Sequence, residues 1–206
     1  GAVSEILTNT TASPVSVTYV YSVSANGCSN PTTANVVVVV NPTPALSSSL
    51  AVSTCSATTF NYAATSGTAG GSFSWSRAVV AGISEAASSG LTGTIAETLT
   101  NLTNTPLVVA YSFVISANGC NNAENVLVTV NPTPVLSSTT SPAAICSGAT
   151  FSYTATSAVG GVSYSWTRSA VAGISEAGSS GLVAGINETL TNTTSSPVVV
   201  TYAFVL

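Results

Sequence analysis

The residues of this 206-residue chain that could carry chemistry are few, and they recur at a spacing of about ninety. The charged side chains are two Arg and six Glu, with no Lys, Asp or His, and there are four Cys. Repeated carboxylates could in principle form a glycosidase pair, and repeated Arg or Trp could bind sugars. Repeated cysteines could form disulfides. The copies that match at this spacing are Cys55 and Cys146, Trp75 and Trp166, and Arg77 and Arg168.

Catalysis is the weakest interpretation of these residues. Glu85 and Glu97 recur as Glu176 and Glu188, without a His, an Asp or a Cys–base pair beside them. Hard-cation sites are built largely from Asp and Glu, and nucleic-acid grooves from clustered Lys or Arg. We therefore expect no enzyme activity, no cofactor, no metal and no nucleic-acid partner. The longest run of valines, Val36 to Val40, is far short of the roughly 20 residues of a membrane span, so we expect no membrane insertion.

The repeated Arg, Glu and Trp side chains fit a structural role better. We expect Arg77 to pair with Glu85 or Glu97, and Arg168 to pair with Glu176 or Glu188. The alternative for Arg77 and Arg168 is binding of an acidic sugar on a surface glycan. Trp75 and Trp166 are expected to be core anchors rather than sugar-stacking platforms.

Alternation of apolar and polar residues predicts strands throughout, with no helical periodicity. The clearest strand follows residue 14 and places Tyr19 on its inner face; the copies of Tyr19 are Tyr111 and Tyr202, and we expect all three in the core. Each of the first two copies runs into an Asn-Gly hairpin turn. Further strands are expected near 46–52, 60–65, 73–77 and 95–99, with returning strands at 36–40 and 126–130. About seven strands per repeat predict an all-β, immunoglobulin-like antiparallel sandwich.

The period also predicts the domains, since Asn-Pro-Thr-Pro at 41–44 and 131–134 is a stiff segment that cannot continue a strand ladder. We expect the last strands of one repeat in residues 1–43, a complete repeat in residues 44–133, and a repeat without its last strand in residues 134–206. The chain is therefore expected to be a segment of a longer tandem array, in which neighbouring repeats contact one another.

The four cysteines recur in step with the repeat and indicate an oxidising compartment. In a seven-strand sandwich, Cys55 and Cys120 fall at opposite poles, about 25–30 Å apart, whereas a disulfide needs Cα atoms within about 7 Å. A bond between the corner Cys of one repeat and the hairpin Cys of the next is therefore favoured over Cys55–Cys120. Cys28, Cys55, Cys120 and Cys146 would then all have partners outside residues 1–206.

Several ordered motifs together resemble a known family: Cys-Ser-Gly at 146–148, Tyr-Ser-Trp-Thr-Arg at 164–168, Asn-Glu-Thr-Leu-Thr-Asn at 187–192 and Val-x-Val-Asn-Pro at 128–132. They resemble the PKD-like, immunoglobulin-like repeats of very large cell-surface adhesins of Bacteroidota. The second copy departs from the pattern with Cys-Ser-Ala at 55–57.

The resemblance implies an extracellular, cell-surface filament or adhesin, exported by the type IX route and in some members moved during gliding. Its partners would be neighbouring repeats, with lateral self-association or surface glycans as further contacts. The alternative is a set of spacer modules in a secreted polysaccharide-degrading enzyme. The sequence leaves open the adhesion target, the number of repeats and any bundling of chains.

Overall fold

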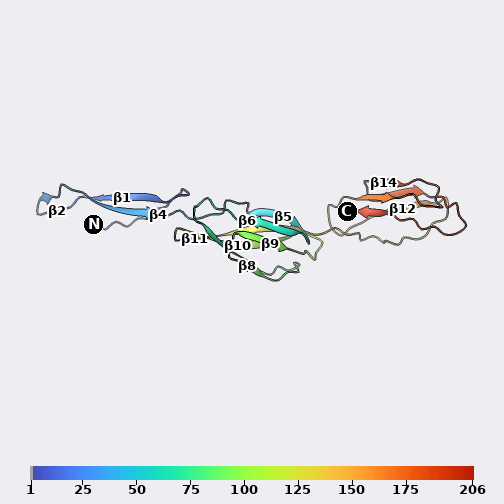
Figure 1. Ribbon diagram of the computed structural model, residues 1–206, viewed down its shortest axis with the longest axis horizontal. Coiled ribbons are helices and arrows are strands. Elements are labelled where there is room, and N and C mark those ends of the chain that lie inside the picture. Colours follow the sequence, from blue (N-terminus) through green and yellow to red (C-terminus); the bar gives the residue numbers. More distant parts are fainter. Residues whose placement is uncertain (1) are drawn as a thin grey trace. The chain divides into compact units, whose positions relative to one another are not determined.

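The computed structural model describes residues 2–206, and all regular structure in them is β-strand (Figure 1). This confirms the predicted all-β class. The chain divides into two compact units. The first takes in the residues up to Thr100 together with Leu107–Val130, and the second takes in Asn101–Pro106 and Asn131–Leu206. Residues 2–43 thus lie in the same unit as most of the complete repeat.

The complete repeat forms a sandwich of seven strands in two sheets. The larger sheet has the order β5-β11-β10-β7-β8, and the smaller pairs β6 with β9. Core side chains such as Tyr111, Phe113 and Val128 are fully buried between the sheets. The strands are β5 (Ala51–Cys55), β6 (Thr59–Ala63), β7 (Ser72–Arg77), β8 (Ser88–Gly90), β9 (Thr94–Thr98), β10 (Leu107–Ala117) and β11 (Cys120–Asn131).

The hairpin β10–β11 shows why the alternating pattern predicts strands here. Every second residue of β10 from Val109 to Ala117 is buried, so one face of the strand closes the core. The turn residues Asn118 and Gly119 have φ of 53° and 78°, the left-handed pair that an Asn-Gly hairpin turn requires. Asn26 and Gly27 adopt the same conformation, with φ of 52° and 79°.

Within residues 2–206, the strands of the N-terminal partial repeat pair only with each other. β1 (Val15–Tyr21) pairs antiparallel with β4 (Ala34–Val40), and β2 (Ser24–Ala25) pairs with β3 (Cys28–Ser29). Tyr19 is half-buried, because within this two-stranded sheet no second layer covers its inner face. Both faces of β4 are exposed at Val36, Val37, Val38 and Val39.

The C-terminal partial repeat, residues 134–206, reproduces only part of the sandwich. Its sheets are β12-β15 and β14-β13-β16. Counterparts of β5 and β11 are missing from the described residues of this repeat, and Tyr202 is half-buried. The strands are β12 (Thr150–Thr154), β13 (Ser165–Arg168), β14 (Ser179–Gly181), β15 (Gly185–Thr189) and β16 (Ala203–Val205).

The first strand of the complete repeat lies later than the pattern predicts. Leu46 makes only an isolated bridge to Ser66, and the strand is Ala51–Cys55 rather than 46–52. Its position is set by β11, because successive contacts join Asn41 to Asn118, Leu46 to Glu124 and Leu50 to Leu127. The partners rise in number together, so this segment runs parallel to β11. Pro42 and Pro44 of the predicted linker are fully buried, so this segment is packed rather than free.

Candidate functional site

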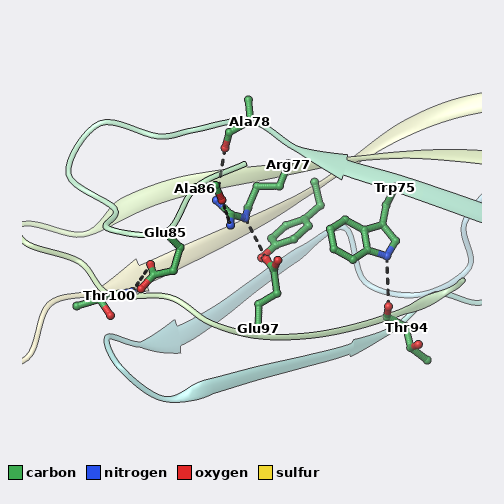
Figure 2. Close-up of polar contacts among 9 residues, drawn as sticks. Trp75, Arg77, Ala78, Glu85, Ala86, Thr94, Glu97 and Thr100 are labelled. Atoms are coloured by element: carbon green, nitrogen blue, oxygen red, sulfur yellow. Dashed lines mark hydrogen bonds and ion pairs between the residues drawn. The ribbon is translucent and has the colours of Figure 1, made fainter. Parts of the chain in front are cut away.

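The strongest polar cluster in the complete repeat joins Arg77, Glu97 and Tyr111, which lie on β7, β9 and β10. Arg77 Nε lies 3.0 Å from Glu97 Oε2, and the Tyr111 hydroxyl donates to the same oxygen at 2.5 Å. Figure 2 shows Arg77 reaching toward Glu97. Because β7 and β10 belong to one sheet and β9 to the other, these bonds tie the two sheets together.

The Arg77 guanidinium is enclosed by acceptors of its own domain. Its side chain is 2% exposed. Besides Glu97, Nη2 donates to the Ala86 carbonyl at 2.7 Å and Nη1 to the Ala78 carbonyl at 3.5 Å (Figure 2). The guanidinium carbon lies 6.0 Å from the centre of the Tyr111 ring. This charge is paired inside the sandwich, so it is not presented to an external anion.

The cluster shifts the ionisation of its acid and its phenol in opposite directions. Burial opposes ionisation of Glu97, but the hydroxyls of Ser88 and Tyr111 and the charge of Arg77 outweigh it and lower the pKa of this carboxyl. Burial and the Glu97 carboxylate raise the pKa of Tyr111 well above its usual value. Tyr111 therefore stays a neutral donor and Glu97 an ionised acceptor at neutral pH.

Glu85, the other candidate partner of Arg77, has a separate role. Its carboxylate accepts from the backbone N–H of Thr100 at 2.8 Å (Figure 2) and from the Ser84 hydroxyl at 2.6 Å. Although partial burial opposes the change, these bonds lower the pKa of Glu85. Glu85 thus fixes the chain that leaves β9.

The same arrangement is built a second time in the C-terminal partial repeat. Arg168 Nε lies 2.9 Å from Glu188 Oε2, and the Tyr202 hydroxyl donates to that oxygen at 2.6 Å. Arg168 Nη2 donates to the Ala177 carbonyl at 2.6 Å. Burial opposes ionisation of Glu188, but hydrogen bonds from Ser179 and Tyr202 and the charge of Arg168 outweigh it and lower the pKa of this carboxyl. Burial and the Glu188 carboxylate raise the pKa of Tyr202 above its usual value.

Glu176 repeats the hydrogen bonds of Glu85, and Tyr19 with Glu5 repeats the contact between Tyr111 and Glu97. Glu176 accepts from the Thr191 backbone N–H at 2.9 Å and from the Ser175 hydroxyl, and these bonds lower its pKa to about 2. In the N-terminal partial repeat the Tyr19 hydroxyl donates to Glu5, and this contact raises the pKa of Tyr19.

The tryptophans pack inside the sandwiches. Trp75 meets the Tyr111 ring edge-on with centroids 5.5 Å apart, and its Nε1 donates to the Thr94 carbonyl at 3.2 Å (Figure 2). A Cβ on Gly90 would lie 2.6 Å from Trp75 Nε1, so the indole occupies the space of a side chain on β8. Trp166 packs on Tyr202 and Gly181 in the same way. Neither indole is a platform for sugar.

The four cysteines are free thiols in this structure. Cys55 ends β5 and Cys120 begins β11, and these strands are neighbours. Since Leu50 lies level with Leu127 and the segment runs parallel to β11, the two cysteines are roughly 40 Å apart at about 3.3 Å per residue. A bond between them would require large movement of the backbone. Cys120 lies at the end of the sandwich where Asn41 contacts the hairpin turn.

The sequence interpretation missed a recurrent asparagine at the start of the loop that precedes the long strand. Asn101 Nδ2 donates to the Thr105 carbonyl at 2.8 Å, while its Oδ1 accepts from the Thr103 N–H and hydroxyl. Asn9 and Asn192 hold their loops in the same way. The repeated Asn-x-Thr triplet was the available signal, and it marks a turn that the asparagine side chain closes.

No group of three or more His, Cys, Asp or Glu in residues 2–206 is placed to hold a metal ion. Across the same residues there is no helix with the length and apolar character needed to cross a membrane.

Comparison with known protein families agrees with this architecture. Residues 52–134 match the family model of the PKD-like domain. No curated protein matches the chain. The sandwich and the match together define a PKD-like, immunoglobulin-like domain within the chain, and such a domain fits a structural or adhesion module.

Proposed function

We propose that this chain is a structural segment of a secreted bacterial cell-surface filament or adhesin, in which tandem sandwiches separate a contact region from the cell. The observation that carries the proposal is the Arg–Glu–Tyr cluster. Its charges are buried and paired within one sandwich, and it is built again about ninety residues later. Charged groups that recur in each repeat and are paired inside each domain stabilise the scaffold rather than bind a ligand.

The surface composition supports an extracellular role. Only 4% of the residues are charged, so the polar part of the exterior consists mainly of Ser, Thr, Asn and backbone. Such a surface responds little to changes in salt concentration. The type IX route and gliding follow from the resemblance to Bacteroidota repeats and are part of the proposal.

Disulfides between successive repeats would stiffen such a segment. The hairpin that carries Cys120 contacts Asn41, at the junction with the preceding repeat, whereas Cys55 lies at the opposite end of the sandwich. The Cys at the corner of one repeat and the Cys at the hairpin of the next would therefore face each other. Mass mapping of non-reduced protein purified from the bacterial surface should find these inter-repeat bonds, and a Cys55–Cys120 bond would contradict them.

The function is tested in the bacterium that makes the protein. Antibodies raised against residues 44–133 should label intact cells, and external protease should remove the label. Replacement of residues 44–134 by an unrelated sandwich of equal length should preserve attachment of the cells, because the segment supplies only spacing. Loss of attachment with the graft would show a ligand-binding role, and labelling only after lysis would contradict the surface location.

A further inference from the structure

The charged side chains on the strands of the complete repeat are directed toward its interior. Residues 44–133 contain four charged residues, and three of them lie on strands. Residues paired across antiparallel strands point to the same face, and each of these three stands opposite a buried aromatic residue. The pairs are Arg77 with Tyr111, Glu97 with Phe60 and Glu124 with Phe113. The strands of this repeat therefore place no charged side chain on the outer face of either sheet.

The outer face of the larger sheet consists of small side chains. Every second residue of β10 from Val108 to Ser116 and of β11 from Asn121 to Thr129 contributes to it, together with the outward residues of β5 and β7. Most of these residues are Ser, Thr, Asn or Ala, with Cys55 at the end of β5. Among them Val108, Val114 and Leu127 are 55%, 41% and 45% exposed. The face thus combines hydroxyl and amide groups with exposed aliphatic surface.

The outer face of the smaller sheet has a different composition. Its residues on β6 and β9 are Thr, Asn and Ala, without a larger aliphatic side chain. Thr59 and Thr98 form a hydrogen bond of 3.2 Å with each other there. Exposed Val and Leu side chains on the sheet faces of the complete repeat are therefore confined to the larger sheet.

The aliphatic positions of the larger sheet's outer face recur with the repeat. Val199 and Val205 stand at the positions of Val108 and Val114, and Val37 stands at the position of Leu127. Packing of the core does not require Val108, Val114 or Leu127 to be apolar, because these side chains alternate with the buried residues of their strands. Their recurrence indicates a contact made outside the sandwich.

The outer face of the larger sheet is large enough for a weak specific contact. β10 and β11 span 11 and 12 residues, and β7 and β5 lie beside them. At about 3.3 Å per residue and about 4.8 Å between strands, the face covers about 500 Å². Two such faces would bury about 1,000 Å², close to the lower limit for specific interfaces.

We propose that the outer face of the larger sheet packs against the same face of a second copy of this chain. It has no charge to attract a charged partner and no aromatic ring on which a sugar could stack. Its match is another uncharged sheet face, because aliphatic groups then meet aliphatic groups and no charge is buried unpaired. The same surface serves both copies, so the contact is isologous. This inference does not depend on the proposed function, because association is measured on the purified chain.

Association is tested by sedimentation velocity of the 206-residue chain under reducing conditions, from about 1 µM to about 1 mM. The average mass should rise with concentration beyond that of one chain. Ala110 is exposed on this face opposite Leu127, so Ala110→Lys should weaken association by about tenfold. Ala96→Lys makes the same change of charge on the outer face of the smaller sheet and should alter association by less than about threefold. A chain that stays monomeric, or equal effects of the two variants, would overturn the proposal.

Salt dependence distinguishes this contact from one between charged patches. Raising the NaCl concentration to about 1 M should not weaken association, because no ion pair contributes to it. Dissociation at high salt would contradict a contact between uncharged faces.

Cross-linking tests the contact independently of how the Lys variants fold. In a chain whose four native cysteines are replaced by Ser, Ala110→Cys should give covalent dimers with a bis-maleimide that spans about 10 Å, the usual distance between packed sheets. Ala96→Cys in the same background should give few dimers. Equal yields from the two variants, or none from Ala110→Cys, would contradict the packing of these faces.

Discussion

The complete repeat and the C-terminal partial repeat share a block of sequence but differ in how far their sheets extend. β10 spans 11 residues, whereas its counterpart β16 spans 3 and begins only at Ala203. The residues before Ala203 alternate as those of β10 do, so local pattern does not explain the difference. The two repeats differ in the presence of β11, which pairs with β10 along its whole length.

The Arg–Glu–Tyr cluster, in contrast, is the same in both regions. Arg–Glu distances of 3.0 and 2.9 Å and Tyr–Glu distances of 2.5 and 2.6 Å differ by no more than 0.1 Å. Arg168 and Glu188 lie on β13 and β15, the counterparts of β7 and β9, and Tyr202 lies directly before β16. The comparison therefore separates a centre that each repeat builds for itself from an outer part that needs the last strand.

The largest expected contrast concerns Val109 and its counterpart Val200. Val109 is fully buried, so Val109→Asp should destabilise its sandwich by more than about 4 kcal/mol. Val200 is half-buried, because the described residues of its repeat contain no counterpart of β11, so Val200→Asp should cost about 1–2 kcal/mol. Urea unfolding followed by Trp fluorescence measures both, with Trp166→Phe leaving Trp75 as the single reporter of the complete repeat and Trp75→Phe leaving Trp166 as that of the C-terminal partial repeat. Equal costs would show that Val200 is as enclosed in solution as Val109.

Loss of the carboxylate from the Arg–Glu–Tyr cluster should destabilise the two repeats equally. Glu97→Gln and Glu188→Gln each leave a buried guanidinium without its counter-ion, and each should cost about 3 kcal/mol. Glu85→Gln is the matched control and should cost about 1 kcal/mol, since it weakens hydrogen bonds to Thr100 and Ser84 only. A much smaller cost for Glu188→Gln than for Glu97→Gln would mean that the second cluster depends on the missing strand.

The glycines that contact the Trp indoles should tolerate an added methyl group equally poorly in both repeats. A Cβ on Gly90 or Gly181 would lie 2.6 or 2.7 Å from the nearest Trp atom, so each Gly→Ala variant should lose about 1–3 kcal/mol. Gly71→Ala places its Cβ 3.5 Å from the nearest atom and should change stability by less than about 0.5 kcal/mol. Thermal unfolding by circular dichroism distinguishes these outcomes, and a tolerated Gly90→Ala would contradict the packing of Trp75.

The smallest effect is a dependence on acid pH that both repeats share. The pKa values of Glu97 and Glu188 are lower in the folded chain than in the unfolded chain. Their contribution is therefore fully present above the ordinary Glu pKa of about 4.3, and it is lost as the pH falls through the folded value. Denaturation midpoints measured from neutral to acid pH should fall in this range. In the Glu97→Gln variant, the fall of the denaturation midpoint should be smaller for the complete repeat and unchanged for the C-terminal partial repeat.

Much of this architecture could be predicted from the sequence because it depends on local rules. The alternation around Tyr111 and the Asn118–Gly119 turn are sufficient to predict the hairpin that dominates the larger sheet. The partner of Arg77 could not be chosen in advance, since Glu85 and Glu97 are both near in sequence. Only the crossing of β9 over β7 places Glu97, and not Glu85, at the guanidinium. β5 likewise begins later than the predicted 46–52, because its position is set by pairing with a strand about 75 residues later.

The parallel alignment of the first strand segment with β11 has a mechanical consequence. A pulling force on the ends of the complete repeat enters before Leu50 and leaves after Val130. Where these two segments lie side by side, the force would drive them past each other lengthwise. The hydrogen bonds between them, including that from Leu127 N–H to the Leu50 carbonyl, are then loaded together in shear rather than opened one after another. A domain with this strand arrangement resists extension until the whole group of hydrogen bonds fails at once.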